Sequence, residues 1–460
     1  MGDLLPLPTA WRLVLEHCSP LAPVDRSPVE GLGRTVAQDV TATVAVPGFD
    51  NSAMDGFAVR AVDASSSPTI LELVGSVMAG QRAASSLRAG EAVRIMTGAP
   101  VPSGADAVCP VEQTIVRGRT VTLTIPVRAG DHVRRAGEDV EAGDTVARAG
   151  EVLGAATIGL LEAVGCRTVR CHPAPRVGVL STGDELLPGA DGGIHDSNRA
   201  ALLGALRSDG MPAVDLGVLP DEPHVVAGAL DRAAQSCDAV ITTGGVSVGD
   251  RDVVRAVLAR TETLVYHWLQ IAVKPAKPLV FAVLEGPRAP VPVFGLPGNP
   301  VSALVSYELF ARPGLRRMAG YRSWWRPATV ASAGTDFARR SDGKTHLVPS
   351  VLRVGPNGRA QVWPCPRQGS HLLTSLTPAN SLVILPDGPG SPAGAGVEAW
   401  VLDAADVFMP PGGRSVPATF APEPCAAPGS GDGPRIDGLH RRAGEPGATP
   451  LVGETADPDR

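Results

Sequence analysis

The sequence predicts an α/β plus β protein, in which a central, mostly parallel α/β domain is combined with two small β-rich domains and an elongated N-terminal helical and β region. Between residues 176 and 296, apolar strand-like runs alternate with helical patterns, which is typical of a parallel sheet covered on both faces. On either side, short β-prone runs are separated by Gly/Pro turns, which predicts small all-β domains. The length of 460 residues suggests about three domains.

The N-terminal region starts with a helical pattern over residues 11–17. The segment SPVEGLGRTVAQDV that follows predicts a short helix leading into a strand. A second segment with frequent glycines begins at residue 133 and ends in the helical pattern GAATIGLLEAVG. We assign these two stretches to one elongated N-terminal domain.

The central domain is predicted from continuous apolar runs bounded by helical patterns. The strand-like runs are RVGVL (176–180), AVDLGVL (213–219), DAVITT (238–243), LVYHWLQ (264–270) and VPVFGL (291–296). The helical patterns are NRAALLGALRSDG, EPHVVAGALDRAAQSC and RDVVRAVLAR. In such sheets ligands bind beyond the carboxyl ends of the strands, so the segments after the strands are the candidate site.

The remaining segments are β-prone or poor in structure. EAVRIM, VTLTIPV and DAVCPVE predict a small β-domain, and THLVPSVLRV, QVWPC and SLVILP predict a C-terminal β-barrel-like domain. The last 50 residues contain nine Gly and nine Pro, a composition typical of disordered segments. The expected domains are 1–45 plus 133–168 (N-terminal), 46–132 (small β-domain, a lid), 169–320 (α/β), 321–408 (C-terminal) and 409–460 (disordered tail).

The bulk composition excludes several classes of function. A net charge of -6 without a long Lys/Arg run argues against nucleic acid. No stretch approaches the length of a membrane span, and the N-terminus lacks the pattern of a signal peptide, so we expect a cytoplasmic protein without a membrane partner. The seven cysteines contain no CxxC pair, and Cys166, Cys171 and His172 lack partners at zinc-ligand spacing.

Chemically unusual loops follow three of the predicted strands. STGDEL carries Asp184 and Glu185, GGVSVGDRD carries Asp250 and Asp252, and PGNPVSALVSYELF opens a helix with a Gly-containing loop. Backbone N–H groups at helix starts favour anions, and the carboxylates would hold Mg²⁺ between phosphates. The alternative is that each carboxylate only caps a helix, and the two aspartates before VVRAVLAR fit that alternative well.

Two further segments present clustered polar groups. FDNSAMDGFAV places Asp50, Asn51, Ser52 and Asp55 on a loop after a strand-like run, which is more than a turn requires, although an Asx-turn remains the alternative. In KPAKP, two prolines favour an extended conformation whose period of three sets both lysines on one side, where an anion or solvent would separate their charges. RIMTGAP and RRAGEDV are weaker candidates because such turns are common.

Together these segments resemble one family, the molybdopterin molybdenumtransferases, or molybdenum insertases, which include the gephyrin E-domain type. The motifs that carry the resemblance are GRTVAQDV, FDNSAMDGFAV, RIMTGAPVPSGADAV, RRAGEDV, STGDEL, DSN, TTGGVSVGDRD, KPAKP and GLPGNPVSA. They span most of the chain up to about residue 408, and only the tail lies outside.

The resemblance implies a homodimer of four-domain subunits that joins molybdate to adenylated molybdopterin with Mg²⁺ and releases AMP. It implies the molybdopterin adenylyltransferase as a candidate partner. The catalytic residues implied are Asp50, Thr97, Glu185, Asp252 and Lys274, with Glu185, Asp221 and Asp252 as metal ligands. The substrate-binding residues implied are Asp139, Ser181, Thr182, Gly183, Asp196, Ser197, Asn198, Gly244, Gly245, Ser247, Lys277, Pro297, Gly298, Asn299, Pro300 and Ser370.

Three positions depart from the family pattern. Gln270 stands where the family has a basic residue, Ala276 replaces the Gly of KPGKP, and Pro349 stands where an Arg is expected. They leave open a second interpretation, a divergent paralogue or scaffold that binds molybdopterin or the finished cofactor without inserting metal. A third, an unrelated nucleotide-binding α/β enzyme, conflicts with the β-domain motifs. The sequence does not distinguish molybdate from tungstate as the substrate.

Overall fold

The computed structural model describes residues 4–81, 85–187, 189, 193–245, 252–260, 263–355, 357–405 and 407. All of them belong to one unit, Met1–Met409. The predicted tail and the candidate residue Ser247 lie outside the described residues. Within the described ranges, no helix is both long and apolar enough to cross a membrane.

Two distant segments of the chain form the N-terminal part. Its strands are β1 (Val24–Arg26), β2 (Thr35–Val36), β3 (Val40–Thr41), β12 (Thr145–Ala147) and β13 (Val169–His172), and its helix is α2 (Ala155–Ala163). β13 pairs with both β1 and β2, and β12 pairs with β3, so strands of the two distant segments pair with one another up to His172.

The first predicted helix is α1 (Leu7–Glu16), which begins earlier than expected because Pro8 is compatible with the first turn of a helix. Its buried face, Ala10 and Val14, packs into the core of the α/β part. The short helix expected in SPVEGLGRTVAQDV is wrong, because residues 28–33 form turns and Gly33 has a φ of 72°.

A six-stranded sheet, in the order β8-β5-β7-β6-β10-β9, forms the small β-domain. Its strands are β5 (Gly56–Val59), β6 (Thr69–Val77), β7 (Glu91–Ile95), β8 (Ala107–Pro110), β9 (Thr114–Arg117) and β10 (Thr120–Leu123), with the 3-10 turns η1 (Ala61–Asp63) and η2 (Val111–Gln113). Beside it, β4 (Asn51–Ser52) pairs with β11 (Val133–Arg134), which brings the FDNSAMDG loop next to RRAGED.

A second six-stranded sheet, in the order β15-β14-β16-β20-β19-β17, forms the centre of the α/β domain. Its strands are β14 (Val177–Thr182), β15 (Ala213–Leu219), β16 (Ala239–Thr243), β17 (Val265–Gln270), β19 (Pro278–Leu284) and β20 (Val291–Leu296). β14, β15, β16 and β20 run parallel, whereas β19, which the sequence pattern did not predict, is antiparallel to both β20 and β17. The carboxyl ends of β14, β15, β16, β20 and β17 therefore share one edge.

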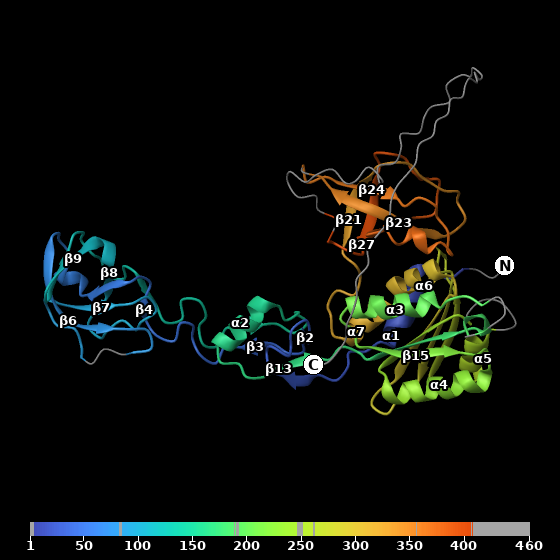
Figure 1. Ribbon diagram of the computed structural model, residues 1–460, viewed down its shortest axis with the longest axis horizontal. Helices are drawn as coiled ribbons and strands as arrows, with labels where there is room; N and C mark the ends of the chain where they lie inside the picture. The colour runs from blue at the N-terminus through green and yellow to red at the C-terminus, as the bar shows by residue number, and fades with distance from the viewer. Residues whose placement is uncertain are drawn as a thin grey trace, which may run out of the picture. The chain divides into compact units, whose positions relative to one another are not determined.

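Helices cover both faces of this sheet (Figure 1). They are α3 (Ser197–Ser208), α4 (Pro223–Ser236), α5 (Val253–Arg260), α6 (Pro300–Ser306), the π-helical turn η4 (Tyr307–Ala311) and α7 (Arg312–Met318). α3, α6 and α7 pack on one face with α1, and α4 and α5 pack on the other. This arrangement confirms the mostly parallel, doubly covered sheet predicted from the alternating patterns.

A buried ionic network lies at the end of α3. Asp209 accepts hydrogen bonds from the Tyr307 hydroxyl (2.6 Å) and from Arg312 Nε (3.1 Å), and it lies 3.3 Å from Arg326 Nη1. Glu308 completes the network with a 2.8 Å contact to Arg326 Nε. Burial of the two arginines is offset only while both carboxylates are present.

The C-terminal strands close into a ring. They are β18 (Val273–Lys274), β21 (Ala328–Ala333), β23 (Thr345–Val354), β24 (Ala360–Pro364), β25 (Ser381–Leu385) and β27 (Gly396–Val401), with β22 (Phe337–Ala338) paired to β26 (Gly390–Ser391) and the turn η5 (Leu373–Ser375). β23 pairs with both β24 and β25, which closes the barrel. β18 lies in the KPAKP segment and pairs with β23, so this segment belongs to the barrel sheet.

Candidate functional site

Three loops at the carboxyl edge of the α/β sheet are held together by one amide. Asn198 Nδ2 donates to the Thr243 hydroxyl (2.9 Å) and to the Gly298 carbonyl (2.7 Å). The Thr243 hydroxyl in turn donates to the Pro297 carbonyl (3.3 Å). The DSN, TTGG and GLPGNP motifs therefore converge, as the strand-end argument predicts.

Glycines in these loops allow close packing around β14. Gly244 has a φ of 86°, and a Cβ there would lie 2.4 Å from the Thr182 carbonyl oxygen. A Cβ on Gly245 would approach the Thr182 hydroxyl to 2.9 Å. Ser181 and Thr182 are buried, and among the described residues their hydroxyls have no hydrogen-bond partner. Side chains at the glycines would push these loops apart.

The carboxylates of this edge fall into two groups. The first lies at the ends of β14 and β15, where the Asp221 N–H donates to Asp184 Oδ1 (3.1 Å). Burial raises the pKa of Asp221, and the charges of Asp184 and Glu185 raise it further. These carboxylates thus repel one another, which is the condition that a divalent cation relieves.

Asp252 forms the second group. It is buried at the start of α5, where its carbonyl accepts from the Ala256 N–H (2.9 Å). In the part of the chain that the structure describes, no three acidic, His or Cys side chains are assembled as a metal cluster. The implied ligands Glu185, Asp221 and Asp252 therefore do not form a preassembled triad.

Some implied substrate-binding residues have structural partners. The Asp196 carboxylate accepts from the backbone N–H (3.1 Å) and Nε (2.8 Å) of Arg199, so it caps α3. Its neighbour Ser197 is exposed. Asn299, which precedes Pro300 at the start of α6, donates through Nδ2 to the Ser370 hydroxyl (3.2 Å) and so connects the sheet edge to the barrel.

A cavity of about 880 Å³ lies between the KPAKP segment and the barrel. Lys274, Lys277 and Ser370 line it, as do Arg340, Lys344 and His346 from the barrel. Several cationic side chains around one space favour an anionic ligand. Pro349 also lines this cavity, at the position where the family pattern has an arginine.

The FDNSAMDG loop organises a second polar group in the small β-domain. Asp50 accepts from the Ala136 N–H (2.8 Å) and from Arg135 Nη1 (2.6 Å), and these two bonds lower its pKa. Asp55 Oδ1 accepts from both the backbone N–H and the hydroxyl of Thr97 (2.7 Å each). The loop is therefore more than a turn, since it fixes the position of Thr97.

Asp139 donates through its backbone N–H to the Val46 carbonyl (3.0 Å), in the segment that precedes the FDNSAMDG loop. Within the described ranges, the side-chain hydrogen bonds of Asp50 and Thr97 stay inside residues 50–136, and neither residue lines the cavity at KPAKP. One chain thus presents two separate groups of candidate residues.

Sequence reasoning missed the residues that act across motifs. Arg135 positions Asp50, and Thr243 joins two loops. Asp55 was already a candidate, but its contact with Thr97 was not predicted. The barrel wall of the cavity, with Lys344 and His346, was also missed. The local signal was the polar segment SDGKTH, which runs into the first two residues of β23 and is indistinguishable from an exposed loop in the sequence.

Fold and site together define a multi-domain α/β protein with a cavity, lined by lysine and arginine side chains, between the KPAKP segment and a C-terminal barrel. Residues 178–317 match the family model of a probable molybdopterin binding domain. Residues 5–165 match the MoeA N-terminal region (domain I and II), and residues 332–402 match the MoeA C-terminal region (domain IV).

Curated relatives agree with these matches. The molybdopterin molybdenumtransferase of Haemophilus influenzae is 36% identical over 367 residues, which covers 79% of this chain and 89% of the relative. Molybdopterin molybdenumtransferase 2 of Mycobacterium tuberculosis is 35% identical over 411 residues, 85% of this chain and 98% of the relative. A crystal structure of a molybdopterin biosynthesis MoeA protein from Pyrococcus horikoshii has a TM-score of 0.71 at 27% identity, over 87% of this chain and all of that chain. The chain belongs to the MoeA family of molybdopterin molybdenumtransferases.

Proposed function

We propose that this chain inserts molybdate into adenylated molybdopterin and releases AMP. Membership of the family makes the chain a transferase of molybdenum cofactor biosynthesis. The observation that carries the specific reaction is the cavity that Lys274 and Lys277 line together with the barrel, beside the start of α6. Molybdate and the substrate phosphates are anions, so lysines and loop N–H groups bind them.

The reaction needs positioning more than covalent catalysis. Lys274 and Lys277 would hold molybdate in the cavity, and Ser370 would orient it with its hydroxyl. The loops joined by Asn198 would hold the pterin and its phosphates at the sheet edge. Molybdate and the substrate are both anions, and their repulsion in water opposes the reaction. The lysines and the loops would lower the activation barrier because they hold the two anions close together.

Mg²⁺ fits the carboxylates at the ends of β14 and β15. Burial raises the pKa of Asp221, and the charges of Asp184 and Glu185 raise it further, which supports a cation-binding role for this group. Glu185 and Asp221 would hold the ion together with phosphate oxygens, and Asp252 would approach it from α5. When bound, Mg²⁺ supplies charge neutralisation for the phosphates and the leaving group.

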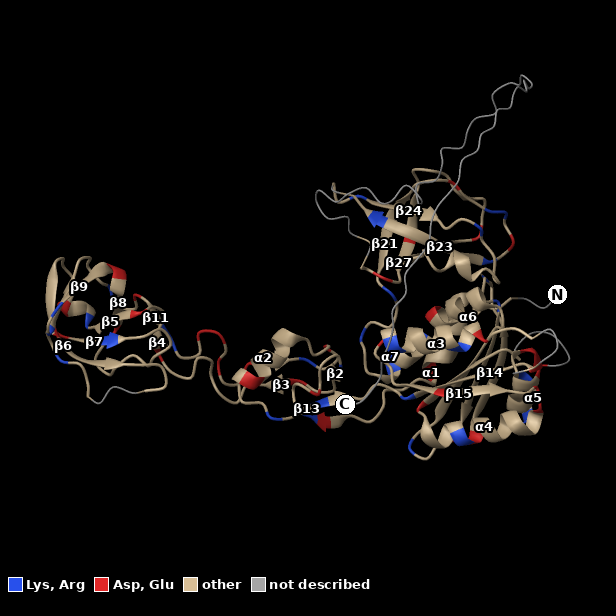
Figure 2. Cartoon of the chain, viewed as in Figure 1, with Lys and Arg blue, Asp and Glu red and all other residues tan. Residues whose placement is uncertain are grey.

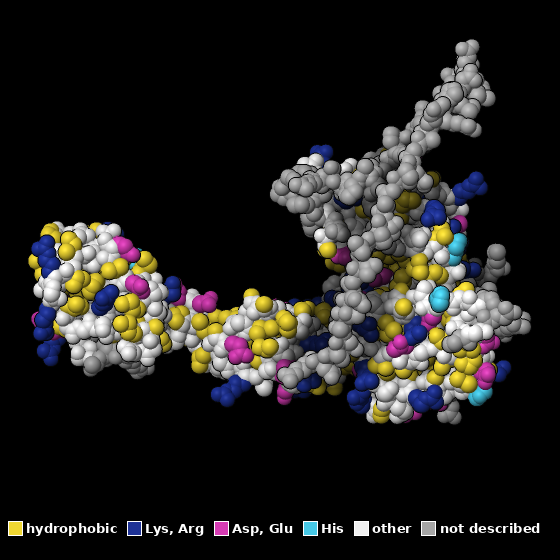
Figure 3. Space-filling model, viewed as in Figure 1, with side chains coloured by type: hydrophobic (Ala, Val, Ile, Leu, Met, Phe, Trp, Pro, Cys, Tyr) yellow, Lys and Arg dark blue, Asp and Glu magenta, His cyan; other side chains and the backbone are white. Residues whose placement is uncertain are grey.

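We further propose that the working unit is a homodimer with a composite site. Asp50 and Thr97 do not line the cavity of their own chain, so a second subunit would supply them. Large apolar side chains are exposed in the N-terminal part, including Val29 (65%), Leu32 (59%) and Val152 (46%). Hydrophobic side chains are visible on the surface of this part, around α2 and β3 (Figure 3), and such surfaces are typical of interfaces.

The charge distribution of the described chain fits small anionic ligands better than a polyanion. Lys and Arg are interspersed with Asp and Glu over the described elements (Figure 2). The substrate would come from an adenylyltransferase, because the pterin phosphate must carry AMP before AMP can be released. Molybdate would join the dithiolene sulfurs of the pterin, and water would cleave the phosphoanhydride bond to AMP. Tungstate has the same charge and shape, so it is an alternative substrate of the same site.

The direct test is AMP release by purified protein with adenylated molybdopterin, Mg²⁺ and molybdate. We expect release that depends on the molybdate concentration. Binding of adenylated molybdopterin without AMP release at any molybdate concentration would support the non-catalytic, cofactor-binding interpretation instead.

The composite site is tested with mixed dimers. Asp50→Ala and Lys274→Ala homodimers should both be nearly inactive. After subunit exchange at equal amounts, half of the dimers are hybrids with one working site of two, so about a quarter of the wild-type activity should return. Absence of recovery, with exchange verified by mass spectrometry, would place both residues in a site within one subunit.

A further inference from the structure

His346 lies directly beside Lys274, although the two residues belong to different parts of the chain. β18 and β23 pair in parallel, and Lys274 is the register partner of His346. Register partners lie on the same face of a sheet, and both side chains line the cavity of about 880 Å³. The barrel thus places an imidazole next to the lysine that the proposed function assigns to the oxyanion.

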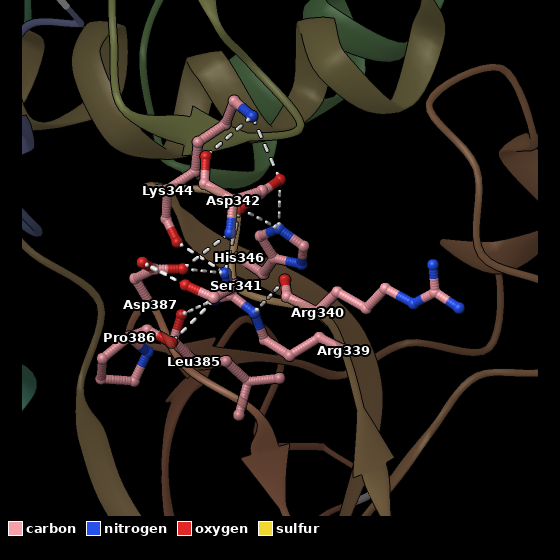
Figure 4. A network of polar contacts seen from close by, with 9 residues as sticks. All are labelled: Arg339, Arg340, Ser341, Asp342, Lys344, His346, Leu385, Pro386 and Asp387. Atoms are coloured by element: carbon pink, nitrogen blue, oxygen red, sulfur yellow. Dashed lines mark hydrogen bonds and ion pairs between the residues drawn. The ribbon is translucent and has the colours of Figure 1, made fainter.

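The hydrogen bonds of the imidazole fix which nitrogen carries its proton. His346 Nε2 lies 3.1 Å from Asp342 Oδ1 and 3.2 Å from Oδ2 (Figure 4). A carboxylate only accepts hydrogen bonds, so Nε2 must carry a proton and donate it. This leaves Nδ1 as the second nitrogen, and within the described ranges it has no hydrogen-bond partner. Protonation would turn Nδ1 into a donor.

Asp342 is itself firmly held. Lys344 Nζ (3.1 Å) and Arg339 Nη2 (3.0 Å) contact its carboxylate, and its backbone N–H donates to Asp387 Oδ1 (3.0 Å). The Arg339 guanidinium is buried, and it also donates to the Leu385 and Pro386 carbonyls, which anchors the network to the barrel (Figure 4). Burial opposes the charge of Asp342, but hydrogen bonds from His346 and Lys344 outweigh it and lower its pKa to about 2. The carboxylate therefore stays ionised and keeps the imidazole oriented.

We propose that His346, in its protonated form, binds the oxyanion in this cavity through Nδ1–H, next to Lys274, and that Asp342 is its positioning residue. This inference rests on the proposed function of the cavity as the molybdate site. His346 and Pro349 lie on the same barrel strand, β23. Pro349 stands where the family pattern has an arginine, and the protonated His346 would supply a cationic hydrogen-bond donor on that strand. Unlike arginine, imidazole gains and loses its charge near neutral pH, so the affinity for the oxyanion becomes pH-dependent.

The sign of that dependence follows from the groups around the ring. Burial lowers the pKa of His346, and the charges of Arg339 and Lys274 lower it further against the opposing effect of Asp342. The charged groups around the ring come from β18, from the segment before β23 and from the turn after β25. They are Lys274, Arg339, Asp342, Lys344 and Asp387. The free protein therefore holds a neutral His346 at neutral pH.

A bound dianion reverses this balance. Its charge favours the imidazolium, so the pKa of His346 rises when molybdate binds, and binding takes up a proton. Between the pKa values of the free and bound states, the affinity should increase by up to about tenfold for each unit by which the pH falls. Molybdate remains a dianion across the neutral range, so this proton belongs to the protein.

The experiment is calorimetric titration of the full chain with molybdate alone, at pH 6, 7 and 8 and in two buffers of different ionisation enthalpy. The wild type should bind more tightly as the pH falls and take up close to one proton. His346→Gln retains a donor for Asp342 but cannot be protonated, so it should bind about tenfold more weakly at pH 6 and lose the pH dependence. Asp342→Asn should weaken binding and shift the pH dependence, because the ring loses its orientation.

The matched control is His224→Gln. His224 also lies near a carboxylate, with Nε2 3.5 Å from Glu222, but it is exposed on α4 and does not line the cavity. This control should bind molybdate as the wild type does. An unchanged pH dependence and proton uptake in His346→Gln, or no pH dependence in a wild type that binds molybdate, would overturn the inference while leaving the proposed function intact. A wild type that neither binds molybdate nor releases AMP would overturn both.

Discussion

Replacing Glu185 by Gln tests the carboxylate that the structure places closest to the glycine loop of β14. A Cβ on Gly183 would lie 2.7 Å from Glu185 Oε1, so the carboxylate occupies the space that the glycine leaves free. Glu185 is exposed, and among the described residues its carboxylate has no ion pair or hydrogen bond. Its charge therefore does not support the fold, and we expect it to act on a bound ligand, as the proposed function requires.

The magnitudes for stability and turnover should consequently differ. Glu185→Gln keeps the volume and hydrogen-bonding reach, so the free energy of unfolding should change by less than about 0.5 kcal/mol. AMP release should fall by about 100-fold, equivalent to about 2.7 kcal/mol of transition-state stabilisation. Gly183→Ala should also reduce AMP release, because the new methyl group displaces the Glu185 carboxylate.

The assay is single-turnover AMP release with saturating molybdate, together with thermal unfolding of each variant. Glu285→Gln is the control, since Glu285 is equally exposed but follows β19 at the opposite edge of the sheet. Wild-type turnover in a folded Glu185→Gln variant would refute the reasoning, and Glu185 would then be a surface residue of the turn.

Three further predictions concern stability. Ala276 has a φ of 78°, a conformation that costs an L-residue about 1–2 kcal/mol. Ala276→Gly should therefore raise the melting temperature measured by thermal unfolding. The control Ala200→Gly, on the exposed face of α3, should lower it. Asp209→Ala leaves Arg312 and Arg326 with Glu308 as their remaining carboxylate partner and should cost about 3–5 kcal/mol in denaturant unfolding. Glu16→Ala, from a surface pair with both side chains more than half exposed, should cost less than about 0.5 kcal/mol. The pKa of Asp221 is raised in the folded state, so its ionisation lowers stability above that pKa and has no effect below the unfolded value. Asp221→Asn should therefore raise the melting temperature at neutral pH but not in acid, and Mg²⁺ should stabilise the wild type more than this variant.

Patterns that repeat along the chain predicted much of the fold. Runs such as AVDLGVL became β15 (Ala213–Leu219) and VPVFGL became β20 (Val291–Leu296), because buried parallel strands need continuous apolar residues. The strand β19 (Pro278–Leu284) was not predicted. It begins at the last residue of KPAKP, so no turn separates the strand from the two lysines in the sequence. Its antiparallel direction depends on pairing with β17 and β20, which is not a local property.

The sequence by itself determined the family, the α/β sheet and the strand-end motifs, because backbone conformation follows from local periodicity, glycine and proline. Only the tertiary structure decided which side chains meet. It showed that the Thr97 hydroxyl donates to Asp55 and that His346 lies beside Lys274. It also showed that the Asp196 carboxylate caps α3. The physical reason is that a hydrogen bond or a charge interaction depends on a distance of a few ångströms between residues far apart in the chain, and strand order and register set that distance.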